Sequence, residues 1–193
     1  FAADLDSLRQ GMFAPGNKGK LIEKTDEGIP VSMNLLTKGF VAADEISRFP
    51  GVTVQKGIHP VIECTQNIPC NPCQDACAKH CIKIGSCITA LPQVENPSPC
   101  TGCGLCVASC SGQAIFLVNE SFESGFASVT LPYEFLPLPV AGDKGTALDR
   151  SGKPVCDAEV VSVKTSPAFD HTNLLTMKVP VDYAMSARFF KKN

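Results

Sequence analysis

Ten of the eleven cysteines lie in one block of the chain, between Cys64 and Cys110. The block ends in Cys100-Thr-Gly-Cys103-Gly-Leu-Cys106-Val-Ala-Ser-Cys110, which has the spacing C-x2-C-x2-C-x3-C. Three cysteines within seven residues match the three-point cap of a cube-shaped 4Fe-4S cluster, and in such motifs the fourth thiolate ligates a neighbouring cluster. The spacing therefore predicts that a second copy of the motif exists.

An irregular copy of the motif precedes this regular one. In sequence order, the irregular copy is called the first copy and the regular copy the second. A shift of 33 residues aligns Cys70, Cys73 and Cys77 with Cys103, Cys106 and Cys110. The same shift aligns Ile82 with Ile115, and each of these begins a short apolar run. The alignment fails at Cys100, because the matching position holds Asn67 and the nearest upstream thiol is Cys64.

Two residues compete for the remaining ligand of the first copy. If Cys64 begins the motif, three residues have been inserted in its first gap, which a surface loop tolerates at little entropic cost. If Cys81 ends the motif, the second gap is stretched by one residue. The internal repeat favours Cys64, since Cys81 aligns with Ala114.

With the fourth thiolate crossing over, the spacing predicts two 4Fe-4S sites of four cysteines each. They are Cys64, Cys70, Cys73 and Cys110 for the first site, and Cys77, Cys100, Cys103 and Cys106 for the second. Cys81, Cys87 and Cys156 are interpreted as small buried residues. Two zinc sites and a disulfide framework are the chemical alternatives, and the confinement of the cysteines to one block argues against the latter.

Composition excludes several classes of function. The net charge of -2 argues against a nucleic-acid partner, which would need a basic surface. No run of about 18 apolar residues is present, so we expect no membrane span and a cytoplasmic protein. The chain has no G-x-G-x-x-G, no phosphate loop and no Cys/His nucleophile pair outside the cysteine block, so no catalytic residues are assigned.

The regions on either side of the cysteine block differ from it in composition and in sequence pattern. Residues 1–58 are predicted to form an irregular arm with one short helix over 40–49, because glycine and proline interrupt longer patterns. Residues 59–125 hold the cysteine motifs. Residues 126–193 are predicted to form a small β domain, with an extended linker or edge at Leu131-Pro132 and 136–139. Its predicted strands lie over 126–131, 155–164, 174–181 and 184–190.

Three segments resemble a known family: Ile62-Glu-Cys-Thr-Gln-Asn-Ile-Pro-Cys-Asn-Pro-Cys73, Cys100-Thr-Gly-Cys-Gly-Leu-Cys106 and Gly112-Gln-Ala-Ile115. They are similar to the 4Fe-4S subunits of multisubunit, flavin-dependent amino-acid and amine dehydrogenases, such as dye-linked proline and hydroxyproline dehydrogenases. The resemblance implies FAD-binding partner subunits, often with a small 2Fe-2S subunit. It also implies that this chain carries electrons without binding the oxidised substrate, and it supports Cys64 as a ligand over Cys81.

The expected fold is α+β, with a core like that of bacterial two-cluster ferredoxins, an irregular N-terminal arm and a small, barrel-like all-β domain at the C-terminus. The expected function is relay of single electrons through two 4Fe-4S clusters, between a flavin-containing partner and another redox centre of an oxidoreductase complex. A free-standing ferredoxin-type carrier is the alternative. An enzyme that uses one cluster directly would need an open iron, which eight thiolates on two cubes do not leave.

Overall fold

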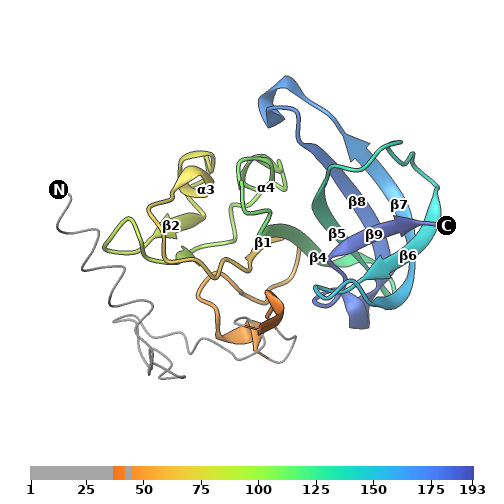
Figure 1. Ribbon diagram of the computed structural model, residues 1–193, viewed down its shortest axis with the longest axis horizontal. Helices are drawn as coiled ribbons and strands as arrows, with labels where there is room; N and C mark the ends of the chain where they lie inside the picture. Colours follow the sequence, from red (N-terminus) through yellow and green to blue (C-terminus); the bar gives the residue numbers. More distant parts are fainter. Residues whose placement is uncertain (1–36, 42–44) are drawn as a thin grey trace, which may run out of the picture.

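The computed structural model describes residues 37–41 and 45–193, and most of these residues pack around an antiparallel sheet. The seven-stranded sheet has the order β1-β4-β5-β8-β7-β6-β9 (Figure 1). Its strands are β1 (His59–Ile62), β4 (Ile115–Glu123), β5 (Phe126–Tyr133), β6 (Lys144–Leu148), β7 (Pro154–Lys164), β8 (Asn173–Pro180) and β9 (Phe189–Lys192). A second sheet pairs β2 (Ile82–Ile84) with β3 (Pro92–Val94).

From residue 45 onward, the helical segments are all short. They are α3 (Pro72–Asp75), α4 (Leu105–Ala108) and the 3-10 helices η1 (Ile46–Arg48), η2 (Pro167–Phe169) and η3 (Val181–Tyr183). The helices α3 and α4 lie with β2 at one end of the molecule, and the strands that follow β4 lie at the other (Figure 1).

The predicted α+β fold with a ferredoxin-like core and a separate barrel-like domain is wrong, because the protein is mostly β. Helices α3 and α4 are four residues each, too short to form a helical layer. Strands β1 and β4 flank the cysteine block, and they join the same sheet as the strands after residue 126. Strands β1 and β9 lie at the two ends of the strand order and do not pair with each other.

Three of the four predicted strands are confirmed, as β5, β7 and β8. The strand predicted over 184–190 is wrong for most of its length, since a turn over 184–186 and two residues without regular structure come first and β9 begins only at Phe189. Leu131-Pro132, predicted as a linker or an edge, is not a linker, because Pro132 lies inside β5 opposite Leu174. Proline is tolerated there because the pairing of β5 with β4 ends at Thr130, which leaves Pro132 a strand on one side only.

The predicted N-terminal arm lies largely outside the described residues. Of the helix predicted over 40–49, residues 42–44 are also outside them, and the described part contains only η1. The side chains of Ile46 and Phe49 are buried with Val41 and Leu91, so this segment packs on the loop that precedes β3.

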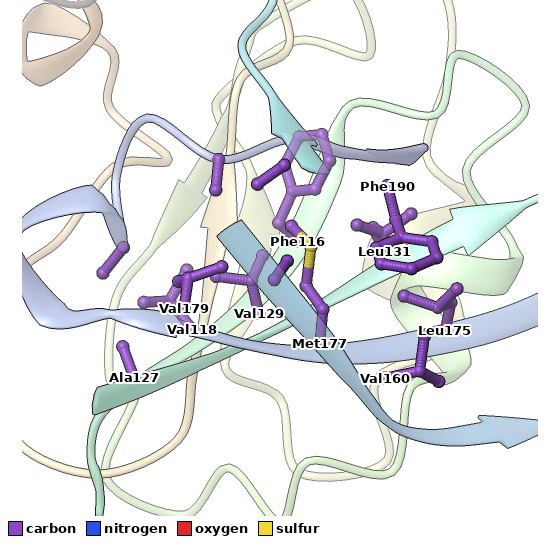
Figure 2. Packing of buried hydrophobic residues seen from close by; sticks show 14 of the residues in the cluster. Phe116, Val118, Ala127, Val129, Leu131, Val160, Leu175, Met177, Val179 and Phe190 are labelled. Atoms are coloured by element: carbon purple, nitrogen blue, oxygen red, sulfur yellow. The ribbon is translucent and has the colours of Figure 1, made fainter. Parts of the chain in front are cut away.

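Two hydrophobic cores share strands of the large sheet, β4 above all. The larger core fills the inner face of the seven-stranded sheet, where Phe116, Val129 and Met177 gather from three strands (Figure 2). The smaller core surrounds the cysteines. Along β4, Phe116 and Val118 belong to the sheet core, whereas Ile115 and Leu117 belong to the cysteine core. Alternate side chains of a strand point to opposite faces, which is why β4 can serve both.

Candidate functional site

The two copies of the cysteine motif have the same local structure. A shift of 33 residues, which aligns their sequences, also superimposes α3 on α4. His80 and Gln113 follow at matching positions, with φ of 52° and 50°, in the left-handed region that few non-glycine residues adopt. Their backbone N–H groups donate to the carbonyl oxygens of Cys77 and Cys110, at 2.8 and 2.9 Å. The internal repeat read from the sequence is therefore also a repeat of backbone conformation.

The strands interleave the two copies. Strand β1, at the start of the first copy, pairs with β4 at the end of the second. Strand β3, at the start of the second copy, pairs with β2 at the end of the first. Each copy therefore depends on the other for its strand partner.

One group of thiols combines three cysteines of the first copy with one of the second. Cys64, Cys70, Cys73 and Cys110 line a common pocket, whose walls include the apolar side chains of Ile62, Ile68, Ile84 and Ile115. Burial, together with the neighbouring Cys110, Cys64 and Cys70 thiols, raises the pKa of the Cys73 thiol to about 11. Burial also raises the pKa of Cys64. These four residues are the predicted first site, called here the first set.

The other group has the reverse composition, with Cys77 from the first copy and Cys100, Cys103 and Cys106 from the second. Burial raises the pKa of Cys106 strongly, and the Cys100, Cys103 and Cys77 thiols add to that effect. Burial raises the pKa of Cys100 as well, with further contributions from Cys103 and Cys77. These four residues are the predicted second site, called here the second set.

Backbone N–H groups donate to the sulfurs at matching positions of the two sets. The donors are Gln66 to Cys64 and Gly102 to Cys100, Gln74 to Cys73 and Val107 to Cys106, Ala114 to Cys110 and Cys81 to Cys77. The last two bonds measure 3.4 and 3.3 Å. Such bonds favour the thiolate, which is the form that binds a metal.

Cys81 is buried against the second set and not against the first copy's other thiols, Cys70 and Cys73. Its thiol interacts electrostatically with Cys77, Cys100 and Cys103, and burial raises its pKa to about 11. Cys64, and not Cys81, lines the pocket of the first set with Cys70, Cys73 and Cys110. The expectation that Cys87 is buried is wrong, since it is exposed and contacts Thr89, while Cys156 is partly buried.

The irregular spacing has a different origin from the predicted insertion. Glu63 and Glu95 lie at equivalent places after β1 and β3. The N–H of Glu63 donates to the carbonyl oxygen of Ala114, and the N–H of Glu95 donates to that of Cys81. The N–H groups of Ala114 and Cys81 in turn donate to the sulfurs of Cys110 and Cys77. Cys70 lies seven positions after Glu63, whereas Cys103 lies eight positions after Glu95. The first loop is thus one residue shorter than the second. Its first thiol, Cys64, directly follows Glu63 at the end of β1, whereas Cys100 lies further along its loop.

A buried ion network beside the first set was not predicted from the sequence. The Glu63 carboxylate accepts hydrogen bonds from Arg188 Nε at 2.6 Å and Arg150 Nε at 2.5 Å, and Arg150 Nη2 also donates to it. Arg188 stacks on Phe116, with 4.9 Å from its Cζ to the ring centroid. The network links the end of β1 to residues next to β9 and β6. Glu63 is 87 positions from Arg150 and 125 positions from Arg188 in the sequence, so no local sequence pattern reveals the network.

Two glycines fit the second loop tightly against neighbouring side chains. Gly104 has φ of 88°, and a Cβ atom there would overlap Leu174 Cδ1. Gly102 has φ of 68°, and a Cβ atom there would overlap Ile58 Cδ1. These contacts bring Ile58 and Leu174 directly over the loop that carries Cys103, an approach that the absence of a Cβ atom permits.

We expect Gly104→Ala to destabilise the protein more than the matched control Gly142→Ala. Both glycines have φ of 88°, but nothing lies within 4 Å of a Cβ atom at Gly142. The control should lose about 1–2 kcal/mol for the left-handed conformation. Gly104→Ala should lose about 1–3 kcal/mol more from overpacking against Leu174. Chemical denaturation measures both values, and equal losses would show that the contact with Leu174 does not matter.

The donor set fits a 4Fe-4S cluster at each place. Four thiols converge from two loops, apolar side chains shield the first set, and amide donors point at the sulfurs. Among the described residues, no three His, Cys, Asp or Glu side chains form a site for a single metal ion. A cube differs from a single ion in that each thiolate binds a separate iron.

The fold and the site together define a mostly β protein with two interleaved groups of four cysteines. Comparison with protein-family models, curated proteins and solved structures found no match to this chain. Within the described part of the chain, no helix has the length and apolar character needed to cross a membrane.

Proposed function

We propose that this chain is an electron-transfer subunit that holds two 4Fe-4S clusters, one in the first set and one in the second. The observation that carries the proposal is the exchange of thiols, in which Cys110 joins the loop of the first copy and Cys77 joins that of the second. This exchange is the ligand pattern of two-cluster iron-sulfur proteins. A bound 4Fe-4S cluster accepts and releases one electron at a time.

The residues around the thiols suit this role. Ile62, Ile84 and Ile115 give the first set an apolar wall, which limits the access of water. Amide donors to the sulfurs stabilise negative charge and so favour the reduced state. Cys70 and Cys103, which occupy equivalent positions, are exposed, so each set has one ligand close to the surface, where an electron could enter or leave.

The relay would connect a flavin-containing partner subunit with another redox centre. The partner class rests on the resemblance to 4Fe-4S subunits of flavin-dependent dehydrogenases. An apolar surface on the loop after β5 supports a subunit over a free-standing carrier, because Leu136 is 82% exposed and Val140 is 63% exposed. Phe135 adjoins them, with its ring edge-on to Tyr133 and Phe189. We further propose a cytoplasmic location, where thiols stay reduced and available as ligands.

Anaerobic purification followed by iron, sulfide and zinc analysis tests the proposal. We expect about eight irons and about eight sulfides per chain, as two cubes require. Reduction with dithionite should produce the electron paramagnetic resonance signals of reduced 4Fe-4S clusters. Two zinc ions without sulfide would contradict the proposal, and so would a protein that folds with all eight thiols free to react with an alkylating reagent.

A further inference from the structure

The two glutamates at equivalent places in the repeat have opposite surroundings. Glu63 and Glu95 each follow a first strand of their copy, and each joins by its backbone to a residue whose N–H donates to a cysteine sulfur. For Glu63 that sulfur belongs to Cys110 of the first set, and for Glu95 it belongs to Cys77 of the second. Any difference between the glutamates therefore acts on one set more than on the other.

Glu63 forms part of a buried group with a net positive charge. Its side chain is 8% exposed, and it lies between Arg150 and Arg188, which are 9% and 3% exposed. Burial lowers the pKa of Arg188 to about 10, with the charge of Glu63 opposing that effect, so the guanidinium stays protonated at neutral pH. One carboxylate between two guanidiniums leaves a charge of about +1, shielded from solvent.

Glu95 forms an exposed pair with no net charge. Its carboxylate lies 2.6 Å from Lys83 Nζ, and the two side chains are 47% and 53% exposed. Opposite charges in contact with water cancel, and salt screens what remains. The second set therefore has no counterpart of the buried positive charge within this pair.

The arginines and the first set border the same groove. It is lined by Cys64, Cys70 and Cys110 on one side and by Arg150, Arg188 and Phe189 on the other, among other residues. Asp149 also lines this groove, but its carboxylate accepts hydrogen bonds from Ser151 and Lys153 and interacts with the Lys153 charge. The buried arginines therefore lie across this groove from three thiols of the first set.

We propose that the Glu63, Arg150 and Arg188 network makes the first set the site of higher reduction potential, so that an electron on this chain moves from the second set to the first. This inference rests on the proposed function. Reduction adds one negative charge, which a nearby buried positive charge stabilises. In the transfer the second set loses one electron and the first set gains it, and no proton or other reactant is needed. The three residues act through their charge, since the sulfur that Arg188 contacts belongs to Met185 and not to a cysteine.

Two variants with opposite charge changes test the inference on the anaerobically purified chain. Glu63→Gln raises the charge of the network, and Arg150→Gln lowers it while leaving Glu63 paired with Arg188. In a potentiometric titration followed by electron paramagnetic resonance, the first should raise one of the two potentials and the second should lower the same one. We expect each shift to reach about tenfold in the reduction equilibrium, which is about 59 mV for one electron.

Glu95→Gln is the matched control, because it removes the equivalent carboxylate at the second set. It should leave both potentials nearly unchanged, since its charge is exposed. Equal potentials in the unaltered protein, or shifts that do not reverse between Glu63→Gln and Arg150→Gln, would overturn the inference. If Glu63→Gln fails to fold, Arg150→Gln still decides the sign. A chain that lacks iron and sulfide would instead refute the proposed function.

Discussion

Replacement of Cys64 by serine is expected to remove about half of the iron and sulfide, because one of the two proposed four-iron sites loses a ligand. Cys64 lines the pocket of the first set together with Cys70, Cys73 and Cys110. Its pKa is raised by burial and by the Cys110 and Cys70 thiols, so a metal cluster would relieve an unfavourable grouping. Iron analysis of the anaerobically purified variant measures the loss, and electron paramagnetic resonance shows which signal disappears.

Two further cysteine variants calibrate that result. Cys81→Ser should keep the full iron content, although its thiol is close enough to Cys77 to perturb the second set. Cys156→Ser, on β7 and away from both sets, should match the unaltered protein. Loss of iron in the Cys81 variant with full retention in the Cys64 variant would reverse the ligand assignment.

Glu63→Ala should destabilise the fold by about 3–5 kcal/mol, the usual cost of leaving a buried charge without its partner. Both Arg150 and Arg188 bind the same carboxylate, so its removal leaves two guanidiniums facing each other in a buried place. Domains of this size have total stabilities of about 5–15 kcal/mol, so the loss would be a large fraction of the total. Chemical denaturation of anaerobically purified protein, with iron content measured in parallel, gives the value.

Glu95→Ala provides the comparison at the equivalent place in the repeat. Because Glu95 and Lys83 are both about half exposed, their pair should contribute about 0–1 kcal/mol. A similar loss in the two variants would mean that the Glu63 network contributes no more than a surface ion pair. A loss confined to Glu63→Ala would support its role in joining β1 to the segment before β9.

The cysteine spacing predicted the local structure well, because ligands held on one loop constrain only neighbouring residues. The repeat of 33 residues recurs in α3 and α4 and in the conformations of His80 and Gln113. The same spacing misled on the gap after Cys64, since sequence letters alone do not show where a strand ends. The equivalence of Glu63 and Glu95 became visible only from their hydrogen bonds.

Long-range organisation could not be predicted from the same information. The predicted fold class is wrong because the sequence shows only a short apolar run from Ile115 within the cysteine region. In the structure this run begins a nine-residue strand of the large sheet. The pairing of β1 with β4 joins residues more than 50 positions apart. The contact between Glu63 and Arg188 spans 125 positions, and no periodic pattern in one sequence encodes such a contact.

Strand β4 makes the two cores mechanically dependent on each other. Ile115 and Leu117 are fixed in the cysteine core, while Phe116 and Val118 are fixed in the sheet core. Because β4 cannot leave one core without leaving the other, we expect the two cores to open together. A ligand bound by the thiols would then contribute its binding free energy to the sheet as well. Damage to the cysteines by oxygen would accordingly shorten the lifetime of the whole molecule, including strands that contain no ligand.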